Sequence, residues 1–177
     1  MSMNLVQPYN PEWPVWFDQI RAALEAALDG AHLDIEHVGS TAVPGMSAKP
    51  IIDIDIVIAN DRFEVVKESL TRLGYDHRGD LGIIGREAFG LTDDQPLKAQ
   101  LPPHHLYVCP EESPELKRHL YFREWLKRNQ PERDYYAHKK MLIAELCDHD
   151  RRMYAQVKEI VLAEFFDQLL QGLESGD

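Results

Sequence analysis

The sequence predicts an α+β fold, in which a small mixed β-sheet is flanked by helices and followed by a helical C-terminal part. Short segments typical of strands alternate with helical segments as far as residue 110, and beyond it the apolar residues follow helical spacing. With 177 residues and 44% hydrophobic content, the chain is long enough for one substantial core. We expect a single domain over residues 1–177, with the sheet-containing core in 1–110 and the helical part in 111–177.

The first expected elements are a helix and a short strand. Asn10 is a suitable helix cap, Pro11 suits the first helical position, and Gly30 is a natural stop. Residues 33–38 read as a strand, whereas residues 41–50 are too rich in Pro and Gly for more than a single helical turn. The apolar stripe of the helix consists of Trp13, Trp16, Phe17, Ile20, Leu24, Ala27 and Leu28.

Residues 51–58 form the clearest strand of the chain. Because side chains alternate along a strand, its four even-numbered isoleucines share one face, and Asp53 and Asp55 share the other. The elements expected after it are a helix over 63–73 between Asp61 and Gly74, two strands in 75–91 around 79–82, a loop over 92–103 and a strand over 104–109.

Three helices are expected to complete the chain. Ser113 and Pro114 are typical of a helix start, and a helix from there would stop before Pro131. The other two helices are predicted over residues 131–147 and 150–170. The apolar stripe of the last one consists of Tyr154, Val157, Ile160, Val161, Phe165 and Leu169.

Composition restricts the partners and the location of the protein. Acidic residues outnumber basic ones 30 to 19, which gives a net charge of −11 and argues against a long nucleic-acid partner. No apolar run is long enough to span a membrane, and no signal peptide is visible. Cys109 and Cys147 have no CxxC pairing, so reduced thiols and a cytoplasmic location are expected.

The two aspartates are the first candidate for chemistry. Asp53 and Asp55 lie on one side of a strand, about 7 Å apart, and carboxylates placed in this way can share a divalent cation. Mg²⁺ prefers carboxylate oxygens and keeps open positions for substrate phosphates. The structural alternative is that both side chains reach solvent at the end of the strand, where their charges need no compensation.

A Gly-Ser turn precedes this strand. Gly39 allows close approach of the backbone to a ligand, and the Ser40 hydroxyl and the N–H groups of the following turn can bind phosphate oxygens. Alone, the pair is as well explained by an ordinary connection between two elements. A strand, a Gly-Ser turn, a loop and then a strand with two alternating aspartates form a much more specific combination.

This combination resembles the motif of the nucleotidyltransferase superfamily, which includes the polymerase β-like enzymes. The wider sequence resembles the GrpB family over nearly the whole chain, and this resemblance implies a nucleotidyltransferase fold. In some proteins a related domain is fused to dephospho-CoA kinase. The stretches that carry the resemblance are residues 8–14 (PYNPEWP), 35–45 (IEHVGSTAVPG), 48–55 (AKPIIDID), 85–89 (GREAF), 104–109 (HHLYVC) and 119–126 (HLYFREWL).

The resemblance also implies roles for individual residues. Nucleotide phosphates would lie at Gly39, Ser40 and Thr41, and the two aspartates would bind Mg²⁺, or Mn²⁺ in its place. The superfamily has a third carboxylate on a later strand, but here the strand over 104–109 offers His105 or His104. His105 is the candidate third metal ligand and general base, and Glu87 is the nearest acidic alternative.

Several basic residues are candidates for phosphate binding. Lys49 and Arg86 could each neutralise phosphate charge or form surface ion pairs, and His37 would face the same crevice as the Gly-Ser turn. The resemblance places a Tyr and Lys pair in the C-terminal helices, where Lys140 is preferred to Lys158. A further cationic or simply solvated helix face consists of His119, Arg123 and Arg128.

The His104-His105 pair also suggests a zinc site. Adjacent residues of a strand point to opposite faces, so the two imidazoles cannot easily share one ion. A zinc site would need His37 or another distant ligand.

Three functions remain open from the sequence. The first is a Mg²⁺-dependent nucleotidyltransferase that moves a nucleotidyl group from a nucleoside triphosphate to the hydroxyl of a small molecule or a protein. The second is a non-catalytic protein of the same fold that binds a nucleotide or a CoA-like ligand. The third is a metal-dependent phosphohydrolase or phosphotransferase with His105 as base. All three have a phosphate-bearing small molecule as partner.

Overall fold

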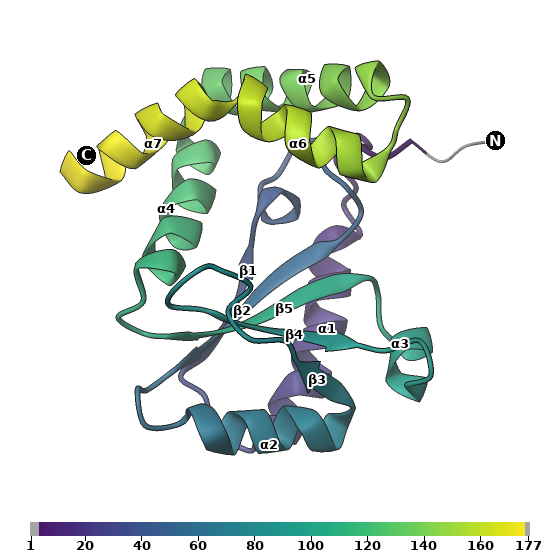
Figure 1. Cartoon of the computed structure of the whole chain (residues 1–177), viewed down its shortest axis with the longest axis vertical. Helices are drawn as coiled ribbons and strands as arrows, with labels where there is room; N and C mark the ends of the chain where they lie inside the picture. Colours follow the sequence, from purple (N-terminus) through teal and green to yellow (C-terminus); the bar gives the residue numbers. More distant parts are fainter. Residues whose placement is uncertain (1–3, 176–177) are drawn as a thin grey trace.

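A computed structural model describes residues 4–175, and its centre is a five-stranded mixed sheet (Figure 1). The strand order is β1-β2-β5-β4-β3, in which β2 and β5 are parallel and the other neighbours are antiparallel. This arrangement confirms the predicted α+β fold with a mixed sheet. The strands are β1 (Asp34–Val38), β2 (Ile52–Ile58), β3 (Tyr75–His77), β4 (Glu87–Leu91) and β5 (His104–Pro110).

One face of the sheet carries the main hydrophobic core. The even-numbered isoleucines of β2 are fully buried there, as the alternating pattern of the strand predicts. They pack with apolar side chains of α1 (Trp13–Leu28) and α2 (Phe63–Leu73). The odd-numbered residues Asp53 and Asp55 therefore point to the opposite face.

Helices α4 to α7 form the helical part of the chain. In Figure 1, α5 and α6 lie at the end of the molecule opposite α2, and α4 runs from the sheet towards them. Their core also contains Leu5, Val6, Val43 and Met46, which come from the start of the chain and from the loop after the Gly-Ser turn. The helices are α4 (Pro114–Arg128), α5 (Gln130–Leu146), α6 (Arg151–Val161) and α7 (Ala163–Ser175).

Helix caps agree with the prediction at some positions and differ at others. The side chains of Ser113 and Asp150 accept hydrogen bonds from the third helical N–H of α4 and α6. Helix α1 begins at Trp13 rather than at Pro11, because the Asn10 side chain accepts a bond from Glu12 N and forms a turn before the helix. The cap of α2 is Arg62 rather than Asp61.

Two other expectations about the elements were wrong. The predicted helix over 150–170 breaks at Leu162, whose buried side chain packs into the helical core. This break turns Ile160 and Val161 outward, and they are 77% and 48% exposed. The predicted loop over 92–103 contains a short helix, α3 (Pro96–Gln100), which has Pro96 in its first turn.

Among residues 4–175 the structure contains no helix that is both long and apolar enough to cross a membrane.

Candidate active site

The Gly-Ser turn packs against the side chain of Asp53. Gly39 follows β1 with φ 71° and ψ −168°, and residues Ser40–Ala42 form a single 3₁₀ turn. A Cβ atom on Gly39 would overlap Oδ2 of Asp53, so only glycine gives both the left-handed φ and the space. Antiparallel pairing of Val38 with Asp53 sets this contact. The predicted turn and the first predicted aspartate are thus in direct contact.

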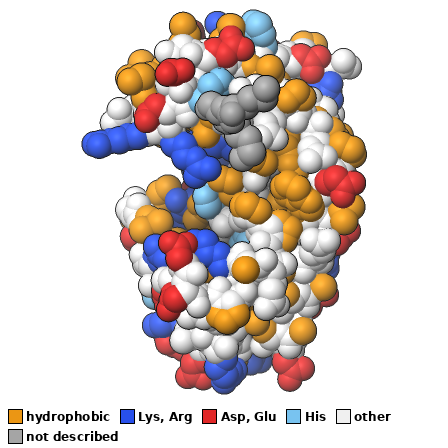
Figure 2. All heavy atoms as spheres, turned by 90° about the vertical axis from the view of Figure 1, so that its right-hand side faces the viewer, with side chains coloured by type: hydrophobic (Ala, Val, Ile, Leu, Met, Phe, Trp, Pro, Cys, Tyr) orange, Lys and Arg blue, Asp and Glu red, His pale blue; other side chains and the backbone are white. Residues whose placement is uncertain are grey.

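A cavity of about 200 Å³ opens beside this turn, which we call the lysine cavity. Three lysines line it: Lys49 from the loop before β2, Lys140 from α5 and Lys158 from α6. Figure 2 shows the molecule hollowed on one side, with Lys or Arg and His side chains along the hollow. The remaining lining residues are Ser40, Thr41, Ala48, Ile51, Asp53, His105, Tyr136 and Tyr154.

Lys140 is the most buried cation of this cavity. It is 3% exposed, and its Nζ donates a 2.9 Å hydrogen bond to Ser40 Oγ. Burial, with a smaller contribution from Lys158 and Lys49, lowers the pKa of Lys140 to about 7. Within the described residues neither Lys140 nor Lys49 forms an ion pair with a carboxylate. The cavity therefore concentrates positive charge in a protein that is acidic as a whole.

Asp53 lies at the edge of the lysine cavity next to His105. Parallel pairing of β2 with β5 puts the two residues side by side, and His105 Nδ1 is 2.8 Å from Asp53 Oδ1. If Nδ1–H donates to the carboxylate, Nε2 is left free to accept a proton. The His105 side chain is 54% exposed, so this nitrogen is accessible to a ligand.

Asp55 has a different environment from Asp53. It is fully buried, and its Oδ2 is 2.7 Å from His119 Nδ1, while His119 Nε2 is 3.0 Å from Glu115 Oε1. Both ring nitrogens face carboxyl oxygens, and when both carboxyl groups are ionised each nitrogen donates, which makes the ring an imidazolium. The other Asp55 oxygen, Oδ1, is buried without a hydrogen-bond partner.

Electrostatics agree with a charged His119. Burial disfavours the imidazolium, but the hydrogen bonds to Asp55 and Glu115 outweigh it and raise the pKa of His119 to about 9. Burial also opposes ionisation of Glu115, yet the bonds from His119 and Arg118 lower its pKa to about 2. Burial raises the pKa of Asp55, and the imidazolium opposes that effect. Asp55 thus has an internal cation as its partner.

Arg86 and Glu87, two further residues with predicted roles, do not line the lysine cavity. The Arg86 guanidinium stacks over Tyr107, 4.2 Å from the ring centroid, and its Nη1 is 3.8 Å from Glu115. Glu87, the nearest acid expected to replace the third carboxylate, bonds to His77 Nε2 at 2.6 Å. The β4–β5 register pairs Glu87 with the core-facing Val108, so its side chain points away from the two aspartates.

Two of the histidines face the other side of the sheet. His37 stacks on Phe17 at a centroid distance of 4.8 Å, and burial lowers its pKa to about 4. It therefore faces the core and not the crevice, and only its bond to Thr41 Oγ1 connects it to the turn. His104 donates from Nδ1 to Pro102 O and accepts from the Tyr75 hydroxyl at Nε2, opposite His105 as predicted.

The predicted cationic face of α4 is mostly neutralised. Arg123 contacts Glu36 and Glu124, and His119 contacts Asp55. Glu115 was not predicted as a site residue, although its spacing of four residues before His119 on a helix indicates a contact. Lys140 was preferred to Lys158 as a candidate for phosphate binding, but both side chains line the lysine cavity.

The carboxylate oxygens of this site can be compared with the ligands that a divalent cation needs. Within the described residues, no group of three or more His, Cys, Asp and Glu side chains is arranged to hold a metal ion. Asp53 is open to the cavity, however, and Asp55, which does not line the cavity, lies two residues further along the same face of β2 with its Oδ1 unpartnered. Carboxylate oxygens that leave positions for phosphate oxygens suit Mg²⁺. These two donors fit such an ion when a ligand completes its coordination.

The fold places the protein among those with a nucleotidyltransferase-like fold. A structure of the Cid1 poly(U) polymerase with MgGTP bound is similar with a TM-score of 0.51 and 10% identity, and the match covers 79% of this chain and 44% of that one. At this identity the similarity shows the fold alone.

The chain belongs to the GrpB family, because the sequence model described as GrpB protein matches residues 4–168. The crystal structure of the conserved protein GrpB from Enterococcus faecalis is 28% identical, with a TM-score of 0.76, and the match covers 94% of this chain and 97% of that one. UPF0157 protein BH1888 of Halalkalibacterium halodurans is 34% identical over 164 residues, which cover 92% of this chain and 80% of that protein. Dephospho-CoA kinase of Mycolicibacterium paratuberculosis is 26% identical, over 89% of this chain and 43% of that protein.

The contact between Asp55 and His119 predicts a large loss of stability on mutation. His119→Ala is expected to lower the free energy of unfolding by about 3–5 kcal/mol, because it leaves a buried carboxylate without its cation. Urea unfolding of the ligand-free protein measures this loss. His138→Ala, at an exposed position of α5, serves as control, and equal small losses in both variants would contradict the assignment.

The burial of Lys140 predicts a stability that depends on pH. The pKa of Lys140 is about 7 in the folded chain, below its ordinary value of 10.5, so the unfolded chain binds more protons between these values. Lys140→Met is expected to stabilise the ligand-free protein most below pH 7, and its advantage should shrink by about 1.4 kcal/mol per pH unit above pH 7. Urea titrations from pH 6 to pH 9 measure the difference. Lys139→Met is the matched control, and a difference independent of pH would refute this reading.

Proposed function

We propose that this protein is a Mg²⁺-dependent nucleotidyltransferase, which binds a nucleoside triphosphate in the lysine cavity and transfers its nucleotidyl group to a hydroxyl. One observation carries the proposal: three lysines and Ser40 converge on a cavity whose edge is formed by Asp53 and His105. Burying like charges together is costly, and a polyphosphate relieves that cost.

Two adjoining cavities suit the two halves of a nucleotide. The lysine cavity provides Ser40 and the three ammonium groups for the phosphates. A second cavity of about 350 Å³ between the Gly-Ser turn and helices α4 and α7 includes Phe122, Phe166 and Leu169, which suit a base and ribose. Ser40, Asp53, Tyr136 and Lys158 line both cavities.

In the proposed reaction the acceptor oxygen attacks the α-phosphorus. The new P–O bond forms as the bond to the bridging oxygen breaks, and pyrophosphate leaves with that electron pair. The proton of the acceptor hydroxyl goes to Nε2 of His105, which Asp53 orients through Nδ1. Lys140 and Lys49 stabilise the negative charge of the leaving pyrophosphate. A Mg²⁺ ion held by Asp53 and Asp55 Oδ1 would supply charge stabilisation at the reacting phosphate.

A non-catalytic binding protein is the second candidate. The observation that favours it is the environment of Asp55, whose carboxylate already has His119 as a cationic partner. Such a site can hold a phosphate-bearing ligand in the lysine cavity without transferring it. The similarity to dephospho-CoA kinase makes CoA and its precursors the natural ligands to compare with nucleotides.

Nucleotide binding tests the part that both candidates share. With Mg²⁺ present, at least one nucleoside triphosphate or CoA precursor is expected to raise the melting temperature, because a ligand stabilises the folded state that binds it. Lys140→Met should weaken this binding about tenfold or more, as a charge-assisted contact to phosphate is lost. Isothermal titration calorimetry gives the dissociation constants, with Lys139→Met as control. Absence of binding by all of these ligands would refute both candidates.

Product analysis separates the two candidates. Incubation with nucleoside triphosphates and a mixture of hydroxyl-bearing acceptors should release pyrophosphate, and His105→Ala should lower kcat by a factor of about 10²–10⁴ without weakening nucleotide binding. Asp53→Ala should abolish both turnover and the effect of Mg²⁺ on affinity. Binding without any turnover identifies a binding protein, and release of inorganic phosphate in place of pyrophosphate identifies a phosphohydrolase.

A further inference from the structure

A larger cavity of about 410 Å³ lies on the other side of His105 from the lysine cavity, over strands β3, β4 and β5. Its floor is formed by Ala88 and Gly90, two small residues of β4 on the sheet face that also carries the aspartates. A Cβ on Gly90 would lie 2.8 Å from Arg78 Nε, so a larger residue would displace that arginine. The hollow therefore exists because β4 carries small side chains here.

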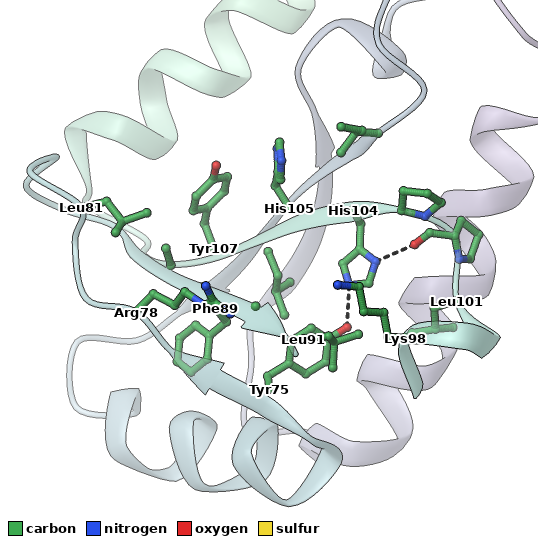
Figure 3. Close-up of a pocket in the computed structure, with 16 residues that line it drawn as sticks. Tyr75, Arg78, Leu81, Phe89, Leu91, Lys98, Leu101, His104, His105 and Tyr107 are labelled. Carbon is green, nitrogen blue, oxygen red and sulfur yellow. Dashed lines mark hydrogen bonds between the residues drawn. The ribbon is translucent and has the colours of Figure 1, made fainter. Parts of the chain in front are cut away.

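The two cavities meet at His105. His105 and Ile51 line both of them, so a ligand in either cavity can contact this imidazole. Figure 3 shows His105 projecting from β5 above the hollow, with Arg78 and Leu81 towards one end and Lys98 towards the other. The imidazole that serves as base in the proposed reaction thus lies between the lysine cavity and this second cavity.

The charges around this cavity indicate an anionic ligand. None of its lining residues is acidic, and Arg78 forms no ion pair with another described residue. Lys98 already pairs with Asp93, at 2.5 Å between Nζ and Oδ1, which leaves Arg78 as the available cation. Apolar side chains such as Leu81, Leu101 and two prolines form much of the rest of the wall, beside the rings of Tyr107 and two histidines. A guanidinium at an apolar wall is suited to one carboxylate or phosphate group.

We propose that this cavity is the acceptor site and that it takes a small hydroxylated molecule with an apolar body and one carboxylate or phosphate group. The anionic group pairs with Arg78, the apolar body lies over Ala88 and Gly90, and the hydroxyl reaches His105. A volume of this size fits a small molecule rather than a folded protein. The assignment rests on the proposed nucleotidyl transfer and names its acceptor as a small anionic alcohol.

Ligand-observed NMR tests the cavity without any turnover. Two matched sets of compounds are used, hydroxycarboxylic acids and phosphate monoesters of alcohols, each with an apolar ring or chain, against uncharged analogues. Compounds of at least one anionic set are expected to bind the wild-type protein, and Arg78→Gln should weaken them about 10- to 100-fold. Arg62→Gln, an exposed arginine at the start of α2, should leave binding unchanged. The set that binds identifies the anionic group.

Transfer then tests the acceptor role. With a binding compound as acceptor, Arg78→Gln should raise the KM for the acceptor by the same factor and leave the dissociation constant of the nucleotide unchanged. If nucleotide binds and pyrophosphate is released while Arg78→Gln alters neither acceptor binding nor its KM, the acceptor assignment is wrong and the proposed function stands. If no nucleotide binds, the proposed function fails, and the acceptor role fails with it.

Discussion

The buried contact between Asp55 and His119 connects the sheet to the helical part, and the geometry of the site depends on it. A carboxylate with no exposed surface needs a cation beside it, and here the cation comes from α4. Glu115 and Arg118 extend this contact along the helix. With α4 held against β2, helices α5 and α6 follow in positions that bring Lys140 and Lys158 over the Gly-Ser turn. The lysine cavity thus depends on the same packing of α4 that neutralises one strand carboxylate.

Sequence periodicity predicted the sheet side of this site well. Alternation along β2 placed the isoleucines in the core and the aspartates opposite, and the same rule separated His104 from His105. These inferences needed only local geometry. The contact between Gly39 and Asp53 needed the β1–β2 register, yet the motif already indicated it.

Features that depend on packing between distant segments were not predictable in this way. The partner of Asp55 lies 64 residues away on a helix whose orientation the sequence does not specify. His37 was expected to face the crevice and Glu87 was the nearest acidic alternative, but both lie on the core face, because the registers of their strands were unknown. The sequence left Arg86 either as a phosphate ligand or in a surface ion pair, and its stacking on Tyr107 could not be inferred from spacing alone. The net charge of −11 also does not indicate where the basic residues lie, and three lysines line one cavity of this acidic protein.

The helical core also contains residues from the beginning of the chain. Leu5 and Val6 pack there, Gln7 pairs with Ala48 in an isolated bridge, and Met46 contributes from the loop before β2. A division at residue 110 would therefore separate the helices from part of their own hydrophobic core. The helical core cannot be completed while the chain is being synthesised, because the first residues pack against the helices that are made last. A fragment of either half alone would lack part of this core, so the elements that carry the two sides of the site depend on the whole chain.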